Sequence, residues 1–239
     1  MMLQRFWKRV EEKTRDNSSA PVLICALGDS VTQGCMEAGK FDFKHVYHRV
    51  LQGMLEARFP KTTFSVINAG VGGESAAGGL QRLARDVLRH APDLTLVAFG
   101  LNDSTQGVKK ISIYRRNLGK IFAGIRANCQ SDIIAVTPGF MANHRNPRIA
   151  RQHRRFTKAI IRSQTGGALK SYVEALKESA LAAGVPVADV HAQWEKLAAR
   201  GKNTDDLLVN GLNHPNATGH QLAARTILQT LLASRPLKP

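Results

Sequence analysis

Residues 21–34 of the chain read PVLICALGDSVTQG. The apolar run from Val22 to Leu27 is typical of a strand that is buried on both faces of a parallel sheet. Gly28 ends the run, and Ser30 follows two residues later. Because the ends of buried strands border the ligand cleft in sheets of this kind, Ser30 is well placed to act as a nucleophile.

The rest of the chain alternates short apolar runs with longer amphipathic ones. Further runs predict strands at Thr63 to Asn68, Leu94 to Phe99, Ile133 to Thr137 and Pro186 to Val190. Apolar residues at intervals of three and four predict helices at Phe43 to Arg58, Gly79 to His90, Tyr114 to Ala127, Leu169 to Ala183 and Thr218 to Ala233. This alternation indicates an α/β fold, a three-layer α/β/α sandwich around a mainly parallel five-stranded sheet.

Two basic segments stand outside this pattern. Residues 1–20 are expected to form a basic helical extension that packs on a single domain spanning residues 21–239. The side chains that would make this contact are Phe6, Trp7 and Val10. Residues 143–170 follow a strand end and hold eight Lys and Arg residues, which predicts a basic lid or insertion over the cleft. A solvated helix is the alternative for this second segment.

The overall composition is strongly basic. The chain has 34 Lys and Arg residues against 18 Asp and Glu, a formal charge of +16 at pH 7. Such a charge attracts anions, so an anionic substrate is one interpretation, and a well-solvated surface is the other. We expect no specific nucleic-acid partner.

Neither a cofactor nor a membrane anchor is predicted. The three cysteines, Cys25, Cys35 and Cys129, form no CxxC or mixed Cys/His spacing of the kind that binds zinc. No run approaches the roughly 18 apolar residues of a transmembrane segment, and the first 20 residues lack the apolar core of a signal peptide. We therefore expect a soluble cytoplasmic protein without a cofactor or metal.

Three polar blocks fall at predicted strand ends or just before the last helix. They read NAGVGGES at residues 68–75, GLND at 100–103 and NHPN at 213–216. A serine hydroxyl needs a neighbouring base to become a nucleophile, and His214 in the last block can supply one. The glycine-rich block does not complete the GxGxxG pattern, so dinucleotide binding is not favoured.

Together with Gly28-Asp29-Ser30, these blocks resemble the signature of the SGNH (GDSL) hydrolase superfamily, from Pro21 to the end of the chain. The resemblance implies a flavodoxin-like sandwich in which Ser30 is the nucleophile and His214 is its base. It also implies an oxyanion hole made by the backbone N–H groups of Ser30 and Gly73 and the side-chain amide of Asn102. Glycine allows close approach to a ligand, and an amide donates hydrogen bonds without a proton to lose.

The sequence departs from the family pattern beside this histidine. In many relatives an aspartate three residues earlier orients the imidazole, but the residue at that position here is Gly211. The possible orienting groups nearby are Asn210, Asp206 and Asp205. We expect a Ser-His dyad whose ring is held by Asn210 or by a backbone carbonyl, and recruitment of one aspartate or an impaired enzyme are the alternatives.

The predicted function is therefore a serine esterase that acts on carboxylic esters. The resemblance suggests short acyl groups, such as acetyl groups on a carbohydrate, and the basic segment 143–170 would favour an anionic substrate. Two alternatives use the same fold. One is an O-acyltransferase with the same residues, and the other is a non-catalytic module that binds a glycan or a polyanion.

Overall fold

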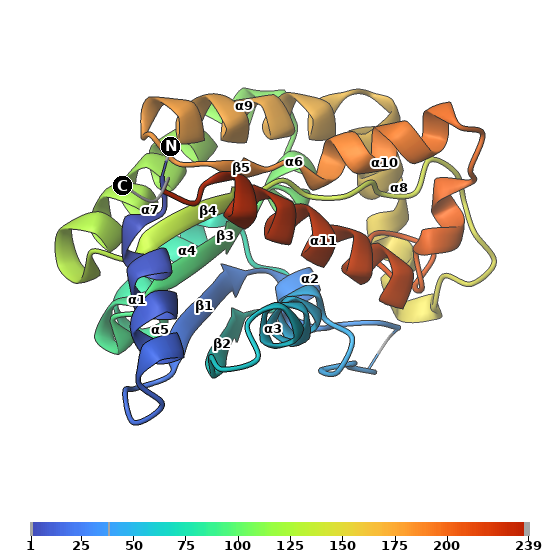
Figure 1. Cartoon of the computed structure of the whole chain (residues 1–239). Helices are drawn as coiled ribbons and strands as arrows, with labels where there is room; N and C mark the ends of the chain where they lie inside the picture. Colours follow the sequence, from blue (N-terminus) through green and yellow to red (C-terminus); the bar gives the residue numbers. More distant parts are fainter. Residues whose placement is uncertain (1, 38, 237–239) are drawn as a thin grey trace.

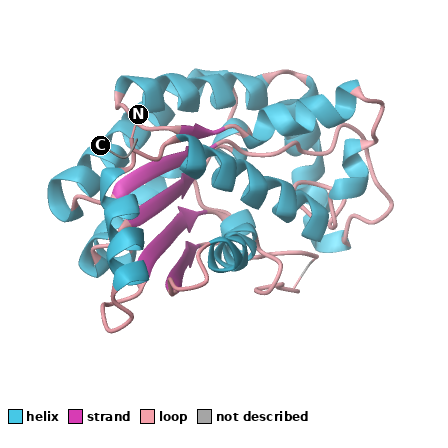
Figure 2. Ribbon diagram, viewed as in Figure 1, coloured by secondary structure: helices cyan, strands magenta, loops and turns pink. Residues whose placement is uncertain are grey.

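The computed structural model describes residues 2–37 and 39–236. A parallel sheet in the order β2-β1-β3-β4-β5 forms its centre (Figure 1, Figure 2). The strands are β1 (Val22–Gly28), β2 (Phe64–Gly70), β3 (Leu94–Ala98), β4 (Asp132–Val136) and β5 (Val187–Ala188). The predicted α/β fold with a five-stranded parallel sheet is confirmed. Connections leave β1 in opposite directions, so the crevice beyond the carboxyl ends of β1 and β3 is the expected ligand site.

Helices cover both faces of this sheet. One layer contains α1 (Gln4–Arg15), α3 (Tyr47–Arg58) and α11 (Ala217–Ala233). The other contains α4 (Ala76–Gln81), α7 (Ile111–Cys129) and α9 (Ala168–Ala182). Successive strand side chains point to opposite faces, so Ile24 belongs to the first core and Cys25 to the second. The continuous apolar run in β1 is thereby explained by burial on both sides.

The fifth strand is shorter than the predicted segment Pro186 to Val190. The reason is Asp189, whose carboxylate accepts a hydrogen bond from the backbone N–H of Ala192 at 3.1 Å and caps a new helix. That helix, α10 (Val190–Ala199), was not predicted from the sequence. Its buried Trp194 contributes to the first core.

The segment predicted as one helix from Gly79 to His90 is broken into three short pieces. These are α4, α5 (Leu83–Asp86) and η1 (Leu88–His90). The break at Arg82 lets its guanidinium turn inward, where the side chain is buried. Helical periodicity in the sequence therefore predicted the right segment but not its interruption.

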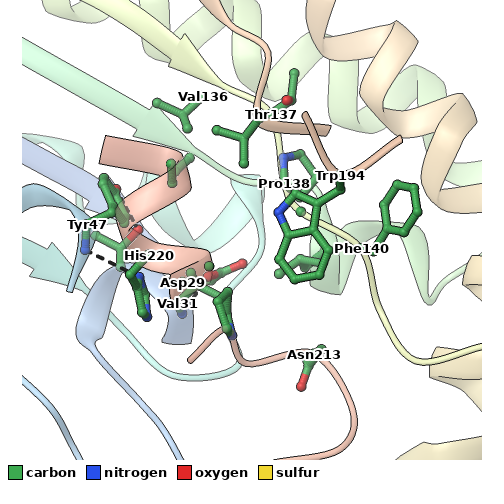
Figure 3. A pocket seen from close by; sticks show the side chains of 18 of the residues that line it. Asp29, Val31, Tyr47, Val136, Thr137, Pro138, Phe140, Trp194, Asn213 and His220 are labelled. Atoms are coloured by element: carbon green, nitrogen blue, oxygen red, sulfur yellow. Dashed lines mark hydrogen bonds between the residues drawn. The ribbon is translucent and has the colours of Figure 1, made fainter. Parts of the chain in front are cut away.

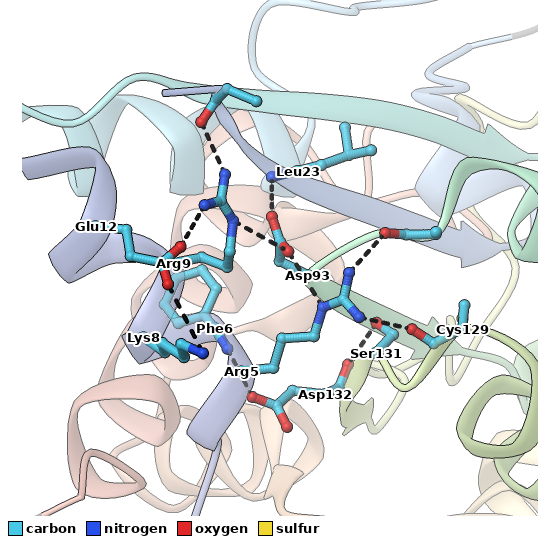
Figure 4. Close-up of polar contacts among 12 residues, drawn as sticks. Arg5, Phe6, Lys8, Arg9, Glu12, Leu23, Asp93, Cys129, Ser131 and Asp132 are labelled. Carbon is cyan, nitrogen blue, oxygen red and sulfur yellow. Dashed lines mark hydrogen bonds and ion pairs between the residues drawn. The ribbon is translucent and has the colours of Figure 1, made fainter. Parts of the chain in front are cut away.

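The N-terminal helix α1 packs on the edge of the sheet where the strands begin (Figure 4). Its residues Phe6, Trp7 and Val10 are fully buried, as predicted for a helix that packs on the domain. Arg5 and Arg9 both reach the carboxylate of Asp93, at 3.2 Å and 3.6 Å. Within the described residues, neither α1 nor any other helix combines the length and apolar character needed to cross a membrane.

The basic segment 143–170 forms a loop followed by η3 (Arg151–His153) and α8 (Arg154–Thr165). Its inner side is apolar, because Ile149 and Ile160 are buried in a small cluster of their own. The other buried members of that cluster are Leu101, Met141, Leu169 and Leu212. The segment is therefore packed on the end of the domain, and only its outer side is solvated.

Candidate active site

Ser30 is the first residue of the short helix α2 (Ser30–Gln33), directly after β1. The turn between them is tight, because a Cβ atom on Gly28 would lie 2.0 Å from Oγ1 of Thr32. Asp29 caps the helix, and its Oδ1 accepts a hydrogen bond from the backbone N–H two residues later at 2.9 Å. The strand β1, the tight turn at Gly28 and the cap by Asp29 together place the Ser30 hydroxyl at the carboxyl edge of the sheet.

His214 meets Ser30 from the other end of the chain. The Nε2 atom of His214 lies 3.0 Å from Oγ of Ser30, and its Nδ1 atom lies 2.7 Å from the backbone oxygen of Met36. Because a carbonyl oxygen only accepts hydrogen bonds, Nδ1 carries the ring proton and Nε2 is left to accept the serine O–H. Burial lowers the pKa of His214, which favours this neutral form. The pair is therefore arranged for proton transfer from serine to histidine.

The Met36 carbonyl is held by the loop that follows α2. The backbone N–H of Cys35 donates to the carbonyl of Ser30 at 3.0 Å, and the N–H of Met36 donates to the carbonyl of Lys40 at 2.9 Å. Cys35 also pairs with Phe41 in an isolated antiparallel bridge. The sequence allowed a backbone carbonyl as the orienting group but gave no sign of which one, because every residue has a carbonyl.

Asn210, the predicted orienting side chain, contacts the backbone of the histidine loop instead of the imidazole. Its Oδ1 accepts hydrogen bonds from the N–H groups of Leu212, Asn213 and His214, each at 3.0 Å. This bonding shapes the turn that carries His214. Asn210 therefore acts on the position of the loop, whereas Met36 holds the ring.

The nearby carboxylates also point away from the imidazole. Gly211 has φ +67°, and a Cβ atom there would lie 3.1 Å from a neighbouring side chain, which explains why no aspartate occupies this position. Asp206 is exposed, with Oδ1 3.8 Å from the guanidinium of Arg148. Asp205 is buried, with Oδ2 3.0 Å from Nδ1 of His144, and burial raises the pKa of Asp205. Both aspartates face the basic segment 143–170.

The three predicted oxyanion donors follow three adjacent strands. Ser30 follows β1, Gly73 lies in the turn after β2, and Asn102 lies in α6 (Leu101–Ser104) after β3. Gly73 is exposed with φ +77°, a backbone conformation that favours glycine. The side-chain amide of Asn102 donates one hydrogen bond to the carbonyl of Glu74 at 2.8 Å. Its second N–H is available to a ligand.

Buried carboxyl groups brace the loops around these donors. Asp103 accepts a hydrogen bond from the backbone N–H of Ala76 at 3.1 Å, which ties the loop after β3 to the loop after β2. Burial raises the pKa of Asp103 to about 6 and the pKa of Asp29 to about 7. Both groups hold backbone N–H donors and lie behind the Ser30-His214 pair.

Arg82 is a buried residue near the site that the sequence analysis did not single out. Its guanidinium donates to the carbonyl of Gly28 at 2.7 Å and to the carbonyl of Ala69 at 2.7 Å. It also pairs with Asp86 at 2.8 Å. These carbonyls lie at the carboxyl ends of β1 and β2, so one side chain ties the serine turn to the glycine-rich loop. Nothing in the sequence distinguishes Arg82 from Arg85 and Arg89 of the same segment, so this contact could not be predicted.

A small cavity of 50 Å³ lies behind the serine turn (Figure 3). Val31, Val136, Phe140 and Trp194 make most of its wall apolar, and Asp29 and His220 supply polar groups. His220 is 1% exposed, and burial lowers the pKa of His220 to about 3. The cavity is therefore a mostly apolar space beside the turn that carries Ser30.

Comparisons with known proteins show the family and the fold of the chain. Residues 26–222 match the GDSL-like Lipase/Acylhydrolase family. No curated protein matches the sequence. Among solved structures, Axe2, an acetylxylan esterase from Geobacillus stearothermophilus, is similar with a TM-score of 0.68 and 19% identity, over 89% of this chain and 95% of that chain.

Two other solved structures have the same fold. A lipase/acylhydrolase from Enterococcus faecalis has a TM-score of 0.66 and 23% identity, over 91% of this chain and 98% of that chain. LAE5, an α/β hydrolase enzyme from the metagenome of Lake Arreo, Spain, has a TM-score of 0.69 and 20% identity over the same shares, 91% and 98%. The family match spans most of the chain. The protein therefore belongs to the GDSL-like lipase/acylhydrolase family and is a hydrolase that acts on ester bonds.

Proposed function

We propose that this protein hydrolyses short-chain carboxylic esters, acetyl esters of carbohydrates in particular, through an acyl intermediate on Ser30. The observation that carries the proposal is the 3.0 Å contact between Oγ of Ser30 and Nε2 of His214, with the opposite ring nitrogen on a carbonyl. A half-buried histidine whose neutral form is favoured, beside a strand-end serine, supports nucleophilic catalysis. The acetylxylan esterase with the same fold supports the choice of substrate class.

The reaction has two halves. In the first, Nε2 of His214 takes the Ser30 proton as Oγ bonds to the ester carbonyl carbon, and the carbonyl oxygen becomes an oxyanion. The N–H groups of Ser30 and Gly73 and the amide of Asn102 donate to this oxyanion. The bond from carbon to the alcohol oxygen then breaks, and the alcohol leaves with the proton from His214. In the second half, water attacks the acyl group by the same route and restores Ser30.

The Met36 carbonyl takes the place that a carboxylate has in a triad. It fixes the tautomer through the bond to Nδ1 at 2.7 Å. The carbonyl dipole also points its negative end at the imidazolium that forms during the reaction. A dipole stabilises this cation less than a full negative charge, so the dyad relies more on the oxyanion donors.

The test is hydrolysis of p-nitrophenyl acetate, butyrate and octanoate by the wild type, Ser30→Ala and His214→Ala. We expect turnover to fall by about 10³-fold or more in both variants, because the two residues act as a unit. Asn210→Ala is the comparison for the loop, since it keeps Ser30, His214 and Met36 but removes the side chain that shapes the turn of His214. The proposal is abandoned if the wild type hydrolyses every ester as slowly as Ser30→Ala.

A further inference from the structure

The segment from residue 143 to residue 170 concentrates positive charge. It holds eight of the chain's 34 Lys and Arg residues and none of its 18 Asp and Glu residues. Five of these cations lie on consecutive turns of η3 and α8, and we call them the basic stripe: Arg151, Arg154, Arg155, Lys158 and Arg162. All five are exposed. Their spacing of three and four residues places them on one side of the helix, along about 16 Å.

The opposite side of α8 packs against the rest of the domain. Thr157, Ile160 and Ser163 are buried there, and Oγ of Ser163 donates to Oγ of Ser104 at 2.8 Å. The stripe therefore cannot turn inward. In Figure 1, α8 stands beyond the arrowheads of the strands, at the same end of the sheet as α2, which begins at Ser30.

The stripe has no counter-charge of its own. None of its five cations is within 4.0 Å of a carboxylate in residues 2–37 and 39–236. Like charges four residues apart destabilise a helix, and the stripe contains three such pairs. Among the described residues, the stripe has one aromatic stacking partner, Phe156, which is 46% exposed and has the guanidinium of Arg155 4.7 Å above its ring. A row of exposed, mutually repelling cations stabilises the fold poorly and attracts an external polyanion strongly.

The basic segment that carries the stripe lines a cavity beside the loops that hold the proposed base. A surface cavity of 360 Å³ is lined by Arg148, Ala150 and His153 of the basic segment and by Glu37, Val209 and Asn210. Glu37 follows Met36, which holds the His214 ring, and Asn210 holds the His214 loop. A polymer lying along the stripe would thus extend toward a cavity that borders the loops of Met36 and His214.

We infer that the basic stripe binds the acidic groups of the substrate, and that this substrate is an O-acylated acidic glycan. The inference rests on the proposed esterase function, because the ligand must carry both a carboxylic ester and a row of negative charges. A lipid surface fits less well, since the apolar side of α8 is buried in the domain and cannot enter a bilayer. Nucleic acid has the row of negative charges but no carboxylic ester, so it does not meet both requirements.

The experiment compares two triple variants with the same change in net charge. The stripe variant is Arg154→Glu, Arg155→Glu and Lys158→Glu, whose new glutamates can pair with the remaining Arg151 and Arg162 and keep the helix stable. The control variant, Arg58→Glu, Lys61→Glu and Arg89→Glu, changes exposed residues next to the starts of β2 and β3, at the opposite end of the sheet. Substrates are acetylated polygalacturonate, uncharged acetylated xylo-oligosaccharides and p-nitrophenyl acetate.

We expect kcat/KM on acetylated polygalacturonate to fall by about tenfold or more in the stripe variant, chiefly through KM. Both neutral substrates should keep their wild-type values. In the control variant, kcat/KM on every substrate should stay within about twofold of the wild-type value. Added NaCl should remove the preference of the wild type for the acidic polymer. Equal losses in the two variants, or none in either, would overturn the inference.

A second measurement does not depend on catalysis. Binding of unacetylated polygalacturonate to Ser30→Ala is followed by calorimetry, with and without the stripe substitutions. Loss of binding with the stripe supports the inference even if no ester is hydrolysed, in which case only the esterase proposal fails. Preferential binding of a DNA duplex or of anionic lipid vesicles through the same residues would contradict the choice of glycan.

Discussion

The helices α1 and η3–α8 carry five Lys and Arg residues each and differ in what surrounds them. In α1 every cation has a polar partner. Arg5 and Arg9 reach Asp93, Lys8 and Arg15 lie near Glu12 and Glu11, and Lys13 donates to two backbone carbonyls. In α8 no cation of the basic stripe has an acidic partner among the described residues.

This difference separates two uses of positive charge. Figure 4 shows how the arginines of α1 fit carboxylates and carbonyls at the starting edge of the sheet, which fixes a helix from outside the predicted domain boundary onto the core. The basic stripe lies at the opposite edge, and among the described residues its cations contact no carboxylate, although Arg155 stacks on Phe156. Net charge alone cannot distinguish the two, because the distinction lies in the neighbours.

The largest expected effect is on the α1 contact. Asp93→Ala removes the acceptor of Arg5, Arg9 and the backbone N–H of Leu23, so the free energy of unfolding should fall by about 3 kcal/mol. Urea unfolding measures this change in the free energy of unfolding. Glu178→Ala, which removes an exposed partner of Arg115, is the control and should change stability by no more than about 0.5 kcal/mol. Equal effects of the two substitutions would show that the α1 pairs are no stronger than surface pairs.

Arg82 extends the comparison to a partnered arginine at the site. Arg82→Met leaves the carbonyls of Gly28 and Ala69 without their donor, which should cost about 2 kcal/mol of stability. Because these carbonyls flank the serine turn and the glycine-rich loop, kcat on p-nitrophenyl acetate should fall by about 10²-fold with little change in KM. Asp86→Asn keeps both carbonyl contacts and should retain most of kcat. An unchanged kcat in Arg82→Met would leave this residue with a purely structural role.

His220 contrasts with Arg82, because it is a buried titratable group whose surroundings disfavour its charged form. Burial lowers the pKa of His220 from 6.5 to about 3, so its contribution to stability is complete above pH 6.5 and is lost as the pH falls toward 3. Relative to His220→Asn, the wild type should lose about 2 kcal/mol between pH 7 and pH 5. Chemical denaturation across this range measures the difference. Parallel pH profiles for the two proteins would contradict the expected burial of a neutral ring.

The smallest effect is expected in the basic stripe itself. Arg154→Gln with Lys158→Gln removes repulsion between residues four apart, so stability should rise by up to about 0.5 kcal/mol. The matched pair in α1, Arg5→Gln with Arg9→Gln, should lower stability because both side chains have partners. Thermal unfolding at low ionic strength compares the two. A clear loss in the α8 variant would mean that the stripe has a structural role after all.

The sequence by itself determined the order and type of most elements and the candidate residues of the site. Short apolar runs such as Val22 to Leu27 predict buried strands, because a strand covered on both faces of a parallel sheet is apolar throughout. Polar blocks at the ends of parallel strands must meet at one edge of the sheet. The resemblance of these blocks to the SGNH signature then implied roles for Ser30, Gly73 and Asn102, and for His214 in the block before the last helix.

Only the tertiary structure decided which groups become partners. The Met36 carbonyl, the inward turn of Arg82 and the pairing of Asp205 with His144 depend on contacts between segments far apart in the chain. A backbone carbonyl leaves no trace in residue identity, and local periodicity does not show where a helix is interrupted. Whether a cation is paired or free is likewise decided by the acids that lie near it in space. That is why α1 and α8 look alike in sequence and differ in the folded protein.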